Sequence, residues 1–180
     1  MQVVSLRSLI DAAKEGNEER ELNDYLSSFI CRKNYDVQSF LHNYAISNEE
    51  RSFTRTSLVI DEENNNDIIG YFTLLVKEFD FSEVSGTTRK KLTNRKDADV
   101  FNSILIAQLG RSDSYKGRVS GKDILELALH NCKLIFDLSA LRVVCVEYEP
   151  IPILNDFYLS NGFYFLQENP SGNILAYLRL

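Results

Sequence analysis

The stretch from Leu109 to Lys122 combines glycine, small polar and basic residues just ahead of a pattern typical of a long helix. The first turn of a helix presents unpaired backbone N–H groups and the positive end of the helix dipole, and both favour a bound anion. Gly117 and Gly121 would let a ligand approach the backbone. Three basic side chains add positive charge: Lys116, Arg118 and Lys122. The segment therefore predicts a phosphate site, with a tight connection of no further function as the alternative.

The glycine spacing in this stretch excludes two common nucleotide-binding motifs. A Walker A loop needs glycine, four residues, and then Gly-Lys followed by Ser or Thr, and the dinucleotide motif needs Gly-x-Gly-x-x-Gly. Gly117 and Gly121 fit neither pattern. Both motifs are therefore excluded for this segment.

Other side chains that could act in catalysis lack partners at a suitable spacing. The three cysteines form no CxxC pair and lie among apolar neighbours, as buried thiols do: Cys31, Cys132 and Cys145. Glu147 and Glu149 alternate on a predicted strand, so both could face a cleft, but a solvated pair on an edge strand is the favoured interpretation. His42 and His130 lie on predicted helices and are interpreted as structural. No metal site is predicted.

Two motifs in the second half resemble those of the GNAT N-acetyltransferase family. Lys116-Gly117-Arg118-Val119-Ser120-Gly121 is similar to motif A, whose backbone amides grip the coenzyme A pyrophosphate, with Val119 in place of the middle glycine. The segment from Asn155 to Phe163 resembles motif B, which has a Phe-Tyr pair, three residues, and then Gly-Phe. The resemblance implies an acyltransferase that uses acetyl-CoA as cosubstrate and acetylates a primary amine by direct attack.

The resemblance also implies a role for each matching position. Tyr158 is implied as the general acid that protonates the departing thiolate, and Asn155 as a contact of the pantetheine arm. Gly110 would permit a bulge in the strand that contacts the thioester. Packing of Tyr158 as a core aromatic beside Phe157 and Phe163 is the alternative. The residues implied to bind the cofactor are Leu109, Gly110, Arg111, Lys116, Gly117, Arg118, Val119, Ser120, Gly121, Lys122 and Asn155.

A weaker match in the first half is similar to the GNAT subgroup that includes bacterial toxins acetylating aminoacyl-tRNA. It comprises Phe29-Ile30-Cys31, Val37 to Leu41, Ala45 and Ile69 to Leu74, with Arg32 where those toxins have glycine. Such a toxin would need a basic face, and the candidate cluster is Arg89, Lys90, Lys91, Arg95 and Lys96. A net charge of -6 argues against a large tRNA footprint.

Three functions therefore remain open at the level of the sequence. An acetyltransferase for a small-molecule or protein amine is favoured. The alternatives are a toxin-like acetyltransferase that acts on aminoacyl-tRNA, and a catalytically degenerate GNAT fold that binds acyl-CoA or a partner without turnover. In this family the acceptor is set by loops such as the one from Ser82 to Ala98, whose shape the sequence does not predict.

Hydrophobic periodicity predicts the elements that must position these residues. Helices are expected around residues 22–29, 37–44, 120–137 and 153–160, with Asp36 as the N-cap of the second and a further short helix within 82–98. Strands are expected at residues 54–61, 68–76, 103–110, 142–148, 163–167 and 173–179. The order strand, helix, strand between residues 103 and 148 predicts a parallel crossover.

These elements predict an α/β fold of the α+β type in one domain, residues 1–180. The resemblance to the GNAT family implies a mixed, mostly antiparallel central sheet flanked by helices, with a splayed parallel strand pair at the acyl-CoA site. The absence of a signal peptide and of a membrane-spanning stretch predicts a cytoplasmic protein without membrane contact. A homodimer is an open alternative, in which the terminal strand Ile174 to Leu180 would pair across the interface.

Overall fold

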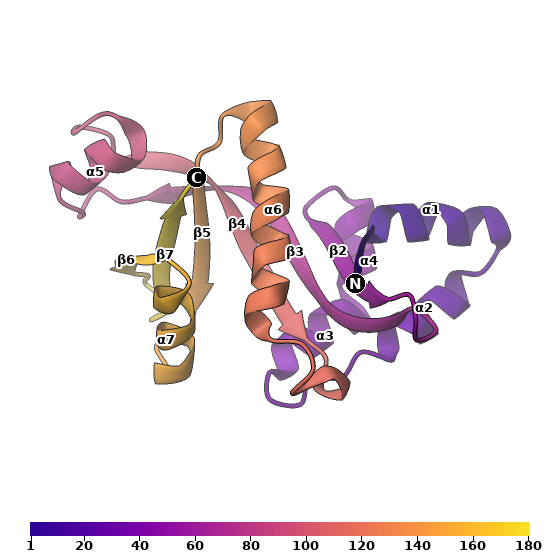
Figure 1. The fold of residues 1–180 in the computed structure, drawn as a ribbon. Coiled ribbons are helices and arrows are strands. Elements are labelled where there is room, and N and C mark those ends of the chain that lie inside the picture. Colours follow the sequence, from indigo (N-terminus) through magenta and orange to yellow (C-terminus); the bar gives the residue numbers. More distant parts are fainter. The chain divides into compact units, whose positions relative to one another are not determined.

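The computed structural model describes residues 1–180, which divide into two compact units. Unit 1 comprises Met1–Leu75 and Gln108–Leu129, and unit 2 comprises Val76–Ala107 and His130–Leu180. The strands follow the order β1-β2-β3-β4-β5-β7-β6 in a mixed, mostly antiparallel sheet, and Figure 1 colours the elements along the chain. The predicted fold class is confirmed. No helix is both long enough and apolar enough to cross a membrane.

Unit 1 contains a helical N-terminal region followed by an antiparallel hairpin. Its elements are β1 (Gln2–Ser5), α1 (Leu6–Gly16), α2 (Glu19–Ser27), α3 (Tyr35–Asn43), α4 (Ala45–Glu50), β2 (Arg55–Asp61), the first part of β3 (Asp67–Asp80), the end of β4 (Val100–Arg111), the 3-10 turn η1 (Asp113–Tyr115) and the first half of α6 (Gly121–Ser139). β2 pairs antiparallel with both β1 and β3, as in Leu58↔Val4 and Leu58↔Tyr71. The apolar faces of the helices pack on this hairpin around Leu6, Leu26 and Leu41, which are fully buried.

The sequence correctly predicted the turn between β2 and β3, but the predicted N-cap of α3 is wrong. Asn65 and Asn66 adopt the left-handed conformation (φ 51° and 56°), which asparagine tolerates better than other residues with a side chain. The N-cap of α3 is Asn34 rather than Asp36, because the Asn34 side chain accepts a hydrogen bond from the Val37 amide at 3.2 Å. Asp36 instead lies in the first turn, where its charge complements the helix dipole.

Unit 2 contains the parallel crossover and the two C-terminal strands. Its elements are the second part of β3, α5 (Gly86–Thr93), the first part of β4, the second half of α6, β5 (Val143–Tyr148), α7 (Pro152–Ser160), β6 (Tyr164–Glu168) and β7 (Ile174–Arg179). β4 pairs parallel with β5 at Ile104↔Val144 and Leu105↔Cys145, and α6 connects them, so the crossover is confirmed. Figure 1 shows α7 beside β7 and β6.

The parallel pair separates after two residue pairs. The ladder ends at Leu105↔Cys145, although β4 continues beyond Ile106 and β5 continues to Tyr148. On its other side β5 remains paired with β7 over six residues, from Val143 to Tyr148. The expected parallel pairing of β4 with β5 is therefore confirmed, and it extends over two residue pairs.

Two expectations about strand edges are wrong. β7 lies between β5 and β6, so both of its edges are already paired and it offers none to a second copy of the chain. β5 is also interior, and Glu147 on it is not part of a solvated edge pair. Its carboxylate accepts hydrogen bonds from Lys77 Nζ at 2.7 Å and from the Asn169 side-chain amide. Because both oxygens of Glu147 are engaged, the structure does not favour this residue as a general base.

Candidate active site

The loop that follows β4 is anchored to two separate parts of unit 1. The Ser112 amide donates to the carbonyl of Ile69 in β3 at 2.8 Å. The Asp113 amide donates to the Ile30 carbonyl at 2.7 Å, and the Asp113 carboxylate accepts from the Arg32 amide at 3.0 Å. We call the loop at residues 112–121, which contains Gly117, the glycine loop. It lies next to the weak motif around Phe29–Cys31 in the structure, although the two are about 80 residues apart in the sequence.

Tyr115 fixes the next part of the loop and was missed by the sequence analysis. Its side chain is 3% exposed, its hydroxyl donates to Asp61 at 2.9 Å, and it accepts from the Asn64 amide at 3.3 Å. Burial, followed by the bond to Asp61, raises the pKa of Tyr115 above its usual value, although the Asn64 bond opposes this. The Arg118 guanidinium lies 4.2 Å from the centre of the Tyr115 ring, and this cation–π contact orients the Arg118 side chain. The only sequence signal was one aromatic residue in a polar segment.

The glycine loop uses some of its own amides to close a tight turn. The amides of Arg118 and Val119 both donate to the Tyr115 carbonyl, at 3.1 and 3.0 Å. The Lys116 amide donates to the Asp113 carbonyl at 3.1 Å. These three amides already have partners within the chain. The prediction that backbone amides of this motif grip a pyrophosphate can therefore apply only to its other residues.

A capping box starts helix α6 and engages one further amide. The Ser120 amide donates to the Asp123 carboxylate at 2.7 Å, while the Asp123 amide donates to the Ser120 hydroxyl at 3.2 Å. The bond from the Ser120 amide also holds the pKa of Asp123 below its usual value, so this carboxylate is ionised at neutral pH. Three amides in and beside the motif are left without a partner in the chain: those of Gly117, Gly121 and Lys122. They are the backbone donors available for an anion.

Two glycines allow β3 and β4 to approach closely where the loop begins. A Cβ atom on Gly70 would lie 2.5 Å from the backbone oxygen of Gly110, and one on Gly110 would lie 2.5 Å from Val37 Cγ1 and 3.2 Å from the Phe29 ring. The structure thus explains Gly110 by close packing. Neither residue has a positive φ, so space and not backbone conformation demands glycine here.

Substituting Gly70 with alanine should destabilise unit 1, because the new methyl group would contact a backbone oxygen that cannot rotate away. Overpacking of this kind costs about 1–3 kcal/mol, measurable as a lower denaturant midpoint in a urea titration. Gly86→Ala is the matched control, since its Cβ would have only ordinary contacts, at 3.6 Å from the Lys96 carbonyl oxygen. Equal midpoints for the two variants would contradict the packing argument.

In unit 2, Tyr158 lies in an aromatic cluster at the end of β5. Its side chain is 8% exposed, and its ring centre is 4.7 Å from that of Tyr148 and 5.5 Å from that of Phe163. Burial, followed by the nearby Tyr148 hydroxyl, raises the pKa of Tyr158 to about 12. The phenol therefore keeps its proton at neutral pH, as a general acid must. These contacts are also the packing that the alternative interpretation expected.

Asn155 is positioned by this same cluster. Its side-chain oxygen accepts a hydrogen bond from the Tyr148 hydroxyl at 2.9 Å, which fixes the orientation of the amide. The amide nitrogen of Asn155 is left to donate elsewhere. For the predicted role of Asn155, a contact to the pantetheine arm, the side-chain nitrogen offers its donors and the oxygen retains one lone pair.

The cysteines and one histidine are structural, as the sequence suggested. All three cysteines are free and buried. Burial raises the pKa of Cys145 to about 12, despite an opposing hydrogen bond with Ser103, and such a thiol is a poor nucleophile. His42 Nε2 lies 2.8 Å from the Phe29 carbonyl oxygen, so this ring ties α3 to the segment before it.

The basic cluster around α5 is partly neutralised. Arg89 forms an ion pair with Asp99 at 3.2 Å, and Arg95 forms one with Asp97 at 3.0 Å. The remaining members of the cluster are exposed and form no ion pair: Lys90, Lys91 and Lys96. The free positive charge here is thus three lysines rather than five basic residues.

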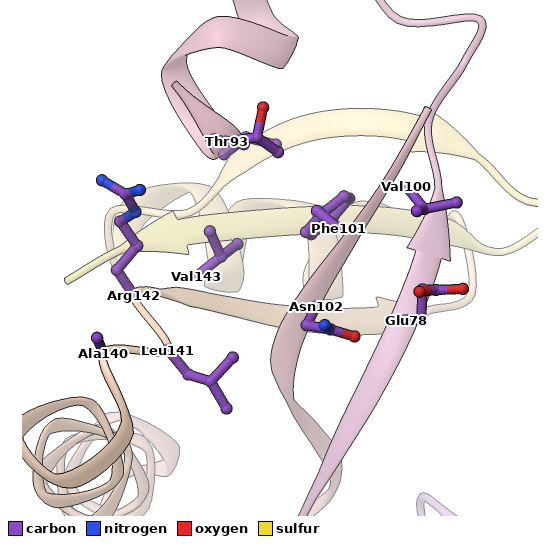
Figure 2. A pocket seen from close by; sticks show the side chains of 10 residues that line it. Glu78, Thr93, Val100, Phe101, Asn102, Ala140, Leu141, Arg142 and Val143 are labelled. Carbon is purple, nitrogen blue, oxygen red and sulfur yellow. The ribbon is translucent and has the colours of Figure 1, made fainter. Parts of the chain in front are cut away.

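A hollow of about 260 Å³ lies in unit 2, at the starts of β4 and β5 (Figure 2). Phe101 forms its middle, with Arg142 and Thr93 on one side and Glu78 on the other. None of the residues predicted to bind coenzyme A or to act in catalysis lines it. The sequence contained no signal for it, because its lining comes from four separate segments.

Comparison with known proteins identifies the fold. No protein-family model matches the chain, and no curated protein sequence matches it. Among solved structures, one described as a bacterial toxin has a TM-score of 0.70 and 18% identity, covering 86% of this chain and 82% of that one. A variant of the toxin AtaT bound to the C-terminus of the antitoxin AtaR and acetyl-CoA has a TM-score of 0.63 and 17% identity, covering 83% of each chain. AtaT complexed with acetyl-methionyl-tRNAfMet has a TM-score of 0.65 and 19% identity, covering 83% and 85%. The GNAT-like fold implied by the sequence is confirmed.

Proposed function

We propose that residues 1–180 form one acetyl-CoA-dependent N-acetyltransferase domain. The observation that carries the proposal is the start of α6, where the amides of Gly117, Gly121 and Lys122 have no partner in the chain. Free amides at the N-terminus of a 19-residue helix, with basic side chains around them, match the charge and donor requirements of a diphosphate. Solved structures with this fold include one that contains acetyl-CoA, which supports the same ligand here.

The proposed reaction is direct attack of a neutral amine on the acetyl thioester. The N–C bond forms, the C–S bond breaks, and the amine nitrogen loses a proton while the leaving thiolate gains one. Tyr158 supplies the proton to sulfur, a role supported by its place in motif B and by a phenol that is protonated at neutral pH. Water takes the proton from nitrogen, since both carboxylate oxygens of Glu147 are engaged in hydrogen bonds. The loop lies in unit 1 and Tyr158 lies in unit 2.

For the acceptor, we propose the amino group of an aminoacyl-tRNA. The observation that favours this acceptor is the fold shared with a toxin solved together with acetyl-methionyl-tRNA. The weak motif around Phe29–Cys31 adds support, because its backbone bonds to the glycine loop. The net charge of -6 is compatible with this acceptor, since three unpaired lysines on and after α5 can contact phosphates locally.

Transfer of labelled acetyl from acetyl-CoA to a set of aminoacyl-tRNAs tests the proposal, with small primary amines measured in parallel. We expect the label to appear on the amino group of at least one aminoacyl-tRNA, together with one free thiol per acetyl transferred. Transfer only to small amines would contradict aminoacyl-tRNA as the acceptor, while the proposal of an acetyltransferase would stand. Coenzyme binding without thiol release for any acceptor would instead identify a binding module.

The three unpaired lysines on and after α5 provide a control on how the tRNA is held. Replacing Lys90, Lys91 and Lys96 together with glutamine should raise the KM for aminoacyl-tRNA and leave the KM for acetyl-CoA unchanged. A matched variant removes three exposed positive charges elsewhere, by Arg7→Gln, Arg20→Gln and Arg51→Gln. If both triple variants raise the KM for tRNA equally, the lysines act only through net charge.

A further inference from the structure

One side chain ties the turn at residues 116–119 to the sheet. Arg111 is the last residue of β4, and its Nη1 donates to the backbone carbonyl of Val119 at 2.9 Å. The other hydrogen bonds of this turn end within the same loop, on Asp113, Ser114 and Tyr115. Arg111 is therefore the direct link between this turn and β4, while Tyr115 links the turn to β2 through Asp61.

The hydrogen bond from Arg111 holds the peptide unit between Val119 and Ser120, which comes just before the free amides of Gly121 and Lys122. The carbonyl of Val119 and the amide of Ser120 belong to one planar peptide unit. Arg111 holds the oxygen of this unit, and the Asp123 carboxylate holds its N–H at 2.7 Å. With both ends held, this plane cannot rotate, and only the two backbone dihedral angles of Ser120 separate it from the peptide unit that carries the Gly121 amide.

Arg111 is held in a position that folding stability alone does not explain. Its Nε is buried and has no hydrogen-bond partner. An unpaired buried donor is costly, and a single bond to a neutral carbonyl does not clearly offset that cost. A buried unpaired donor therefore calls for an explanation, and a functional role is one of those that apply. The position of Arg111 is thus better explained by its hydrogen bond to the loop than by a contribution to the stability of the fold.

We propose that Arg111 is a positioning residue for coenzyme A. By holding the Val119 carbonyl, it keeps the amides of Gly117 and Gly121 in the arrangement that receives the pyrophosphate. The inference rests on the proposed function, since it concerns the same ligand. It differs from the role that the sequence resemblance implied for Arg111, a backbone contact, because here the guanidinium acts on the loop and not on the ligand.

The test compares Arg111→Met, which keeps the volume and removes every donor, with Arg111→Lys, which keeps the charge and one donor. Calorimetric titration with coenzyme A at about 0.1 M and about 0.5 M salt separates positioning from charge, because a buried hydrogen bond is little screened. We expect Arg111→Met to raise the Kd about tenfold at both salt concentrations, and Arg111→Lys to lie between it and the unaltered protein. Hydrogen exchange of the ligand-free Arg111→Met variant should be faster only in residues 116–122.

Several results would overturn the inference. An unchanged Kd for Arg111→Met would do so, as would a loss that shrinks at high salt and is restored fully by lysine, since both are signs of simple charge attraction. Faster exchange throughout unit 1 would mean that Arg111 stabilises the fold in general. Failure of the unaltered protein to bind coenzyme A at either salt concentration would contradict the proposed function itself, which is a separate outcome.

Discussion

Replacing Tyr158 with phenylalanine should lower kcat by about 100-fold or more while leaving the Kd for acetyl-CoA within about twofold. General acid catalysis typically contributes 10²–10⁴-fold, and only the hydroxyl that delivers the proton is lost. The ring and its contacts with Tyr148 and Phe163 are retained, so the aromatic cluster should stay intact. Steady-state turnover with the acceptor identified by the transfer assay, together with calorimetric titration of acetyl-CoA, measures both quantities.

The control for this variant is Tyr148→Phe, which removes the neighbouring hydroxyl and frees Asn155. It should weaken acetyl-CoA binding more than it lowers kcat, because Asn155 is proposed to contact the pantetheine arm. Equal losses of kcat in both variants would indicate that the cluster acts only by packing. Unchanged turnover in Tyr158→Phe would rule out the acid role.

The raised pKa of Tyr158 also sets the direction of the pH dependence. The pKa moves from 10.0 to about 12 because burial disfavours the phenolate. The folded protein therefore keeps this proton across the range in which an exposed tyrosine loses it, and the donor is lost only as the pH passes the raised value. In a profile of kcat against pH, no decline due to Tyr158 should appear below about pH 10. A descending limb near neutral pH that disappears in Tyr158→Phe would contradict this assignment.

Replacing Gly121 with glutamate should weaken acetyl-CoA binding by at least about 100-fold. The new carboxylate would stand at the first residue of α6, beside the amides proposed to receive the pyrophosphate, and like charges at about 4 Å repel by roughly 1–4 kcal/mol per pair near a protein surface. A negative charge at a helix N-terminus favours the helix, so folding should not suffer. Calorimetric titration gives the affinity, and the thermal midpoint checks the fold.

Leu138→Glu is the matched control for this charge. It adds the same carboxylate to the other end of α6, at a residue that is 90% exposed. Its affinity for acetyl-CoA should equal that of the unaltered protein. If Gly121→Glu binds as tightly as Leu138→Glu, the start of α6 is not the pyrophosphate site, and the proposed function loses the observation on which it depends.

The sequence alone determined most of the elements and their order. The strand and helix patterns from residue 54 onward match β2 to β7 and α5 to α7 within a few residues at each boundary. The period of two residues in strands and of 3.6 residues in helices is a local property, so it can be recognised without knowledge of the fold. The elements at residues 2–16 and 45–50 were missed, although α1 buries Leu6, Ile10 and Ala13 at helical spacing. The glycine loop was found for the same local reason, since its residues are contiguous.

Only the tertiary structure decided which groups in that loop are free to act. The Tyr115 hydroxyl bonds to Asp61, 54 residues away, and the Arg32 amide bonds to Asp113 across 81 residues. The close approach of Gly70 and Gly110, and the interior positions of β5 and β7, likewise depend on distant segments. A hydrogen bond or a packing contact is set by distance in space, and no local pattern of residue types encodes that distance. The sequence therefore located the loop that we propose as the anion site, while the fold left three of its amides without a partner in the chain.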